Sequence, residues 1–161
     1  MITSCTGNKL NLNYGAIVRF SLLIIIILSV VLLPVLSYST ESLIVSVDFK
    51  SLIQGSVKIS PDSRRVAYVA KVGNKQIVVV DGKKGKQYDG IVSGSLVFSP
   101  DSERVAYAAM IGNMKFVVVD GKEGKQFNTI VRGKIVFDSD ENLHYLALSN
   151  NQIFLEEMEL R

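Results

Sequence analysis

Side chains that could do chemistry are few in this sequence and lie far apart. It contains one cysteine, Cys5, and one histidine, His144, whereas a zinc site of the Cys/His kind needs three or four such ligands. No serine lies in a Gly-x-Ser-x-Gly elbow, the turn that presents the nucleophile of α/β-hydrolases. We therefore predict no enzymatic activity, no metal and no cofactor, with His144 packed on a strand or at its solvent edge. No ligand-binding residue is assigned.

The acidic segment 138–142, Asp-Ser-Asp-Glu-Asn, resembles the start of a calcium loop because oxygen ligands stand at its first, third and fifth positions. Leu143 follows where the tight turn of such a loop needs glycine, and Ser149 stands where a bidentate glutamate belongs. The segment also falls in the register of a Ser-Pro-Asp-Ser turn that occurs twice earlier in the chain. We therefore expect a turn here, with calcium binding as the alternative.

Two lysine-rich loops, residues 82–86 and 121–125, resemble phosphate-binding loops only superficially. A P-loop has four residues between its glycines and a helix behind it, whereas these loops have two residues between glycines and are followed by strand-like sequence. We expect solvated hairpins. The alternative is a basic edge that meets an acidic partner or anionic lipid headgroups.

An internal repeat sets the architecture that must position these side chains. Residues 55–93 align without gaps on residues 94–132, with 24 identities in 39 positions. A third, partial copy covers 133–161, and residues 44–54 match the ends of the repeats more weakly. A period near 40 residues built of short apolar runs is typical of a propeller blade.

Each repeat divides into four apolar runs separated by turn signals, which in the first copy are residues 57–60, 65–71, 75–81 and 86–92. Valine-rich runs of this length between glycine, proline and asparagine predict strands. Within the second run, Tyr68 and Ala70 fall on one face while Ala67 and Val69 fall on the other. Both faces are apolar, so we expect such a strand to have a sheet packed on each side.

The predicted fold is all-β, with about three four-stranded antiparallel blades and 12 strands in residues 40–161. Residues 44–54 are predicted as an orphan outer strand, and the last blade ends at its third strand, 152–160. Because an unpaired strand edge is an aggregation hazard, strand 44–53 of one chain could complete the last blade of another in a two-fold homodimer. An open or tightly curled monomer is the alternative.

The motifs of the repeat support a family resemblance. An aromatic or aliphatic residue, then Ser-Pro-Asp-Ser, two residues, Val-Ala-Tyr and a valine strand ending in Asp-Gly occur at 59–82 and 98–121. This pattern resembles the WD-like repeat of TolB-type β-propellers, with partial copies extending it over roughly residues 44–160. Three blades are fewer than the four to eight that propellers usually have.

The resemblance implies a binding or assembly module with a protein partner, since such propellers serve as periplasmic binding proteins, interaction scaffolds and accessory domains of peptidases. Two alternatives remain open. The chain could be the accessory propeller part of a hydrolase system, or a truncated copy of a longer repeat protein.

Residues 1–39 have the order of an export segment. The uncharged block 20–36 follows Lys9 and Arg19 and precedes the small polar residues Ser37 and Ser39. We predict an apolar helix here, either a signal peptide cut after Ser39 or an uncleaved membrane anchor. In both cases residues 40–161 lie outside the cytoplasm, where the domain is membrane-anchored, secreted or periplasmic.

The charge balance argues against a nucleic-acid partner. The whole chain has a net charge of +3. Without Lys9 and Arg19, residues 40–161 carry 16 basic and 15 acidic residues that alternate along the chain. A nucleic-acid surface normally clusters uncompensated lysine and arginine.

Export can be tested with a reporter fused after Arg161. Because the apolar block follows two basic residues and precedes only β sequence, we expect the reporter to be active outside the cytoplasm. Cytoplasmic activity without membrane association would contradict this topology.

Overall fold

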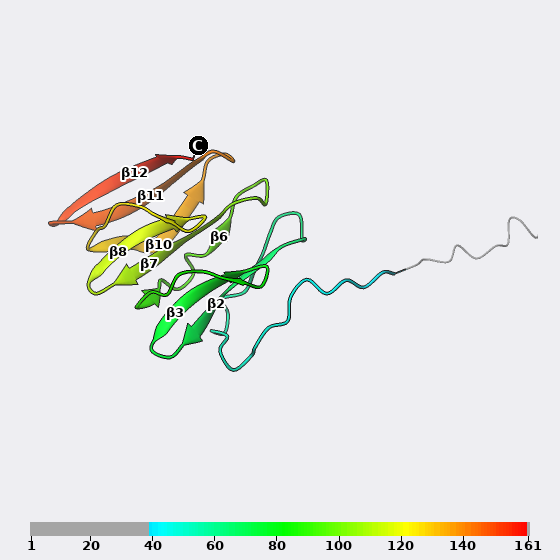
Figure 1. Ribbon diagram of the computed structural model, residues 1–161. Helices are drawn as coiled ribbons and strands as arrows, with labels where there is room; N and C mark the ends of the chain where they lie inside the picture. Colours follow the sequence, from blue (N-terminus) through cyan, green and yellow to red (C-terminus); the bar gives the residue numbers. More distant parts are fainter. Residues whose placement is uncertain (1–38, 161) are drawn as a thin grey trace, which may run out of the picture. The chain divides into compact units, whose positions relative to one another are not determined.

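The computed structural model describes residues 39–160, which are all-β and contain no helix (Figure 1). Their strands form three antiparallel sheets of four, five and three strands. The predicted export helix at 20–36 lies outside the described residues. Within residues 39–160, no helix is long and apolar enough to cross a membrane.

The three sheets follow one another along the chain. The first has the order β1 (Lys58–Ile59), β2 (Val66–Val72), β3 (Lys75–Val80), β4 (Lys83–Lys84). The second contains β5 (Gly90–Ile91), β6 (Val97–Phe98), β7 (Val105–Ile111), β8 (Met114–Val119) and β9 (Lys122–Glu123), with β5 and β6 both paired to β7. The third has the order β10 (Thr129–Phe137), β11 (Asn142–Ser149), β12 (Gln152–Glu159).

The prediction of a fourth strand at 86–92 is wrong. Asp81 and Gly82, both at positive φ, turn the chain so that β4 at once takes the outer position beside β3. The following chain makes one bridge, between Tyr88 and Gln76 of β3, and then pairs with β7 of the second sheet through β5. Residues 86–92 therefore cross from one sheet to the next.

The predicted strand at 44–53 is also wrong. Residues 44–51 form no strand, and the chain joins the first sheet only at Leu52, which bridges Ala70 of β2. Leu52 therefore pairs on the β2 side of the first sheet. The outer strand, β4, lies on the opposite side, beside β3. In the repeat register Leu52 corresponds to Ile91 of β5 and to Ile130 of β10, whose ladder to β11 is broken by a bulge before Ile135. The prediction of an all-β fold with three antiparallel sheets is confirmed for the described residues, but the sheets have four, five and three strands instead of an orphan strand followed by blades of four, four and three.

The prediction that such a strand has a sheet packed on each side is confirmed for β7 of the second copy, whereas β2 has a sheet on one side only. Ala67 and Val69 of β2 share a buried cluster with Tyr107 and Ala109 of β7. The opposite face of β7 shares a second cluster with the third sheet, in which Ala106, Ala108, Tyr145 and Ala147 are buried. The second sheet therefore lies between the other two (Figure 1).

The two ends of this stack differ. The outward face of the first sheet, which includes Tyr68 and Ile77, is buried under Val47 and Leu52 of the preceding chain. The outward face of the third sheet leaves Leu146 44% exposed, Ile153 65% and Leu155 58%. Within the described residues, nothing covers those side chains.

Small residues set the spacing between the sheets, which gives a test of the stack. Replacing the fully buried Ala108 by leucine inserts three carbons between the second and third sheets, so we expect about 2 kcal/mol lower stability from overpacking. Leu146 occupies the same repeat position in the third sheet, and Leu146→Ala is expected to cost less than about 1 kcal/mol because its side chain is half exposed. Urea unfolding in dilute protein measures both; equal costs would contradict the exposed position of Leu146.

Candidate functional site

The Ser-Pro-Asp-Ser turns are fixed by their own aspartates. Asp62 Oδ1 accepts hydrogen bonds from Ser60 Oγ at 2.5 Å and from the Arg64 N–H at 3.1 Å. These bonds lower the pKa of Asp62, the Ser60 bond contributing most. Asp101 is held in the same way, with its pKa lowered first by Ser99 and then by the Glu103 N–H. These carboxylates stabilise turns, as local side-chain hydrogen bonds do elsewhere.

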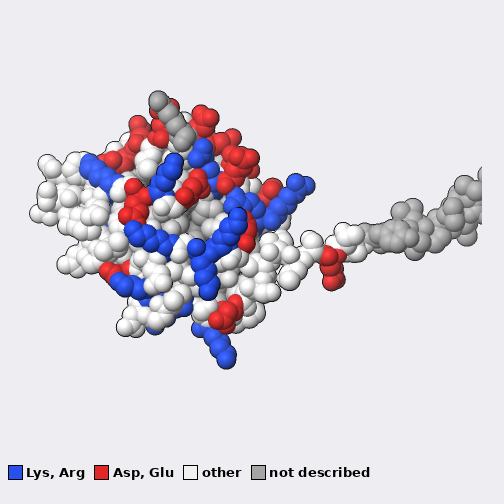
Figure 2. All heavy atoms as spheres, in the orientation of Figure 1, with Lys and Arg blue, Asp and Glu red and all other residues white. Residues whose placement is uncertain are grey.

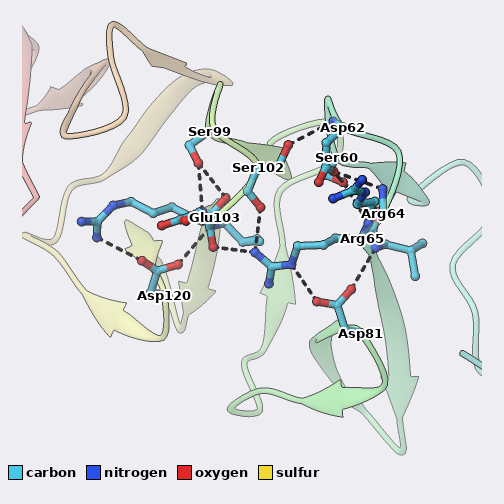
Figure 3. Close-up of polar contacts among 12 residues, drawn as sticks. Ser60, Asp62, Arg64, Arg65, Asp81, Ser99, Ser102, Glu103 and Asp120 are labelled. Atoms are coloured by element: carbon cyan, nitrogen blue, oxygen red, sulfur yellow. Dashed lines mark hydrogen bonds and ion pairs between the residues drawn. The ribbon is translucent and has the colours of Figure 1, made fainter. Parts of the chain in front are cut away.

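The same turns join the first sheet to the second (Figure 3). Arg65 pairs through Nε with Asp81 Oδ2 at 2.8 Å and donates through Nη1 to the carbonyl oxygens of Ser102 at 2.8 Å and Glu103 at 2.5 Å. The Asp62 N–H adds a bond to Ser102 Oγ at 3.1 Å. One guanidinium thus ties two sheets together through charge-assisted hydrogen bonds. We call Arg65 and its partners the arginine clamp.

The clamp weakens along the repeat. Arg104 Nη1 lies 3.3 Å from Asp120 Oδ2, and its Nη2 donates to the Leu160 carbonyl at 3.4 Å. In the third copy Asn142 stands at the position of these arginines. The third sheet therefore lacks the side chain with which each earlier sheet holds its successor.

The calcium-like segment is a turn, as expected. Ser139 Oγ accepts the N–H groups of Glu141 and Asn142, and Asp140 Oδ1 accepts the Asp101 N–H at 3.1 Å. His144, on β11, lies with Nδ1 2.7 Å from Asp138 Oδ2. Among residues 39–160, no group of three or more His, Cys, Asp and Glu side chains could hold a metal.

The lysine-rich loops form the β3–β4 and β8–β9 hairpins. Lys86 pairs with Glu123 at 2.7 Å, which lowers the pKa of that carboxyl, and Lys125 pairs with Glu156 at 3.1 Å. Each of these lysines therefore reaches the next sheet. Figure 2 shows the resulting surface, where basic and acidic side chains are interspersed.

A groove of about 320 Å³ opens between the first two hairpins. Its lining includes the clamp residues Arg65 and Asp81 together with Lys83, Lys84 and Tyr107. The corresponding groove between the second and third sheets is half that volume, about 160 Å³, and contains Glu123 at the repeat position of Lys84. The first groove is thus the more basic, although Arg65 is already engaged in the clamp.

A second hollow of about 320 Å³ lies on the third sheet, lined by Arg132, Lys134, Val136, His144 and Leu146 among others. It is part of a surface that we call the outer face of the third sheet. The register of the three strands places these side chains there, among others: Val136, His144, Leu146, Leu148, Ile153, Leu155 and Glu157. Lys134 of β10 lines the same hollow and belongs to this face.

Sequence reasoning placed His144 on a strand but did not find this surface. A signal was present, since the third copy departs from the repeat at these positions. Ala67 and Ala106 correspond to His144, and Ser56 and Ser95 correspond to Lys134.

Comparison with models of known protein families and with curated proteins found no match for this chain. The resemblance to TolB-type propellers therefore stays a prediction.

The clamp generates a test with a matched control. Arg65→Met removes an ion pair and two bonds to carbonyl oxygens from a side chain that is 31% exposed, so we expect about 2 kcal/mol lower stability after allowing for solvent screening. Arg104→Met, which removes longer contacts, is expected to cost less than about 1 kcal/mol. If both variants lost the same free energy of unfolding in chemical denaturation, the Arg65 hydrogen bonds between the sheets would contribute nothing to stability.

Proposed function

We propose that this chain is an extracytoplasmic binding or assembly module of propeller-like blades, and that it docks a protein on the outer face of the third sheet. Residues 20–36 serve as its signal peptide or membrane anchor. The single observation that carries the proposal is the exposure of Leu146, Ile153 and Leu155 on one sheet face. Contiguous apolar surface with a polar margin is typical of protein interaction sites.

The composition of this face supports docking. Leu146 and Leu155 are direct neighbours across the β11–β12 ladder, and Leu148 is the neighbour of Ile153. Lys134 of β10 lines the same hollow as Leu146 and borders them on one side, and Glu157 of β12 borders them on the other. An apolar centre with charged residues at its margin fits a protein partner better than a lipid surface, which would favour a cationic margin alone.

The other surface features support this proposal less well. The groove beside Lys83 and Lys84 is more basic, but its arginine is committed to the clamp. The Asp62 and Asp101 carboxylates are committed to their turns. Docking through the third sheet uses Leu146, Ile153 and Leu155, which stay exposed among the described residues.

Site-specific photocrosslinking tests the proposal in the full chain in cells. A photoreactive residue at Ile153 should give a crosslinked protein product, because this side chain lies on the proposed docking face. The control is the same residue at Ile59 of β1, which is equally exposed at 65% but lies on the first sheet. No product at Ile153, or the same product at both positions, would refute docking on the third sheet.

A further inference from the structure

The two ends of the sheet stack limit what can cover the outer face of the third sheet. Successive sheets meet front to back, so another copy could extend the stack only by offering the outward face of its first sheet. That face is already occupied, because Tyr68, Ala70, Ile77 and Val79 are buried beneath Val47 and Leu52 of the same chain. Head-to-tail stacking of copies would require this segment to leave.

The outer face of the third sheet is also not built for another blade. The corresponding faces of the first two sheets carry Ala67 and Ala106, where the third carries His144. Ser95, fully buried against its neighbours, corresponds to Lys134. Val80 and Val119 correspond to Glu157. Charged and larger side chains thus replace the small ones that allow close sheet packing.

These substitutions place opposite charges on opposite margins of one apolar surface. Lys134 lies on β10 and Glu157 on β12, with β11 between them. Leu146 of β11 lines the same hollow as Lys134 and lies on the same face as Glu157. Within the described residues, neither Lys134 nor Glu157 takes part in an ion pair. The surface is therefore complementary to itself after a rotation that exchanges its two margins.

We propose that a second copy of this chain covers the outer face of the third sheet, related by a two-fold axis that runs along β11. This arrangement sets β10 of each copy over β12 of the other, so Lys134 meets Glu157 of the second copy twice. A two-fold axis across the strands would instead set β10 over β10 and bring the two Lys134 side chains together. The inference rests on the proposed docking function and names its partner.

The size of the surface predicts a reversible dimer. Three strands of eight or nine residues cover on the order of 400 Å² at ordinary strand spacing. A stable specific interface buries about 800 Å² on each partner. The association is therefore concentration-dependent, and it closes on two copies because the interface is isologous.

Charge reversal across the axis tests this geometry. Using the full chain in detergent, sedimentation over a range of concentrations should show Lys134→Glu and Glu157→Lys each weakening dimerisation by at least about tenfold, because each places like charges together twice. The double variant restores both pairs with the signs exchanged, so its dissociation constant should return to within about threefold of the original. Lys71→Glu, at an exposed position near the end of β2, is the control and should leave dimerisation unchanged.

Circular dichroism confirms that each variant is folded, as expected for exposed positions. A monomer at all concentrations, or a dimer that none of the variants alters, would overturn the inference. Single variants that weaken the dimer without rescue in the double variant would overturn the axis along β11.

Crosslinking at Ile153 separates this inference from the proposed function. A product of twice the chain mass that contains only this chain supports both. A product with a different protein overturns the second copy and leaves the docking function standing. No product overturns both.

Discussion

The strands of the second sheet carry buried side chains on both faces, Ala106 and Ala108 on one and Tyr107 and Ala109 on the other. A sheet of this kind is stable only when something packs on each side, because each exposed face would return its apolar area to water. The first and third sheets meet this need, and each in turn has one face directed away from the stack. The covering of those two terminal faces is the problem that any short array of repeats must solve.

The chain solves the problem differently at its two ends. Residues 45–52 lie over the first sheet, and Val47 buries part of its outward face. On the third sheet the apolar centre stays exposed while Lys134, His144 and Glu157 make the surface more polar than the faces buried between sheets. A surface that combines apolar and charged side chains can stay exposed to water in the monomer, and it can also be covered by a partner.

The polar contacts between sheets also become weaker from the first sheet to the third. Arg65 joins the first two sheets by close bonds to Asp81 and to two carbonyl oxygens, Arg104 makes longer contacts, and Asn142 stands in their place on the third sheet. The loss of the arginine coincides with the loss of small residues on the adjoining face. Both changes support the proposal that the third sheet meets a second copy of the chain and not a further sheet of the same stack.

Local sequence determined the two long strands of each repeat and the hairpin that joins them. Alternating apolar positions indicated two buried faces in the Val66–Val72 strand, and the glycine and asparagine at 73 and 74 indicated the hairpin that joins it to Lys75–Val80. These features depend on backbone preferences and a period of two residues, which are readable over a few positions. Only the tertiary structure decided that residues 86–92 cross to the next sheet and that Leu52 joins the inner edge of the first. A period of two fixes the face of a side chain but not the strand that receives its backbone hydrogen bonds. The exposed face around Leu146 depends in the same way on tertiary structure, because exposure is set by which sheet packs above it and not by the residues of the strand itself.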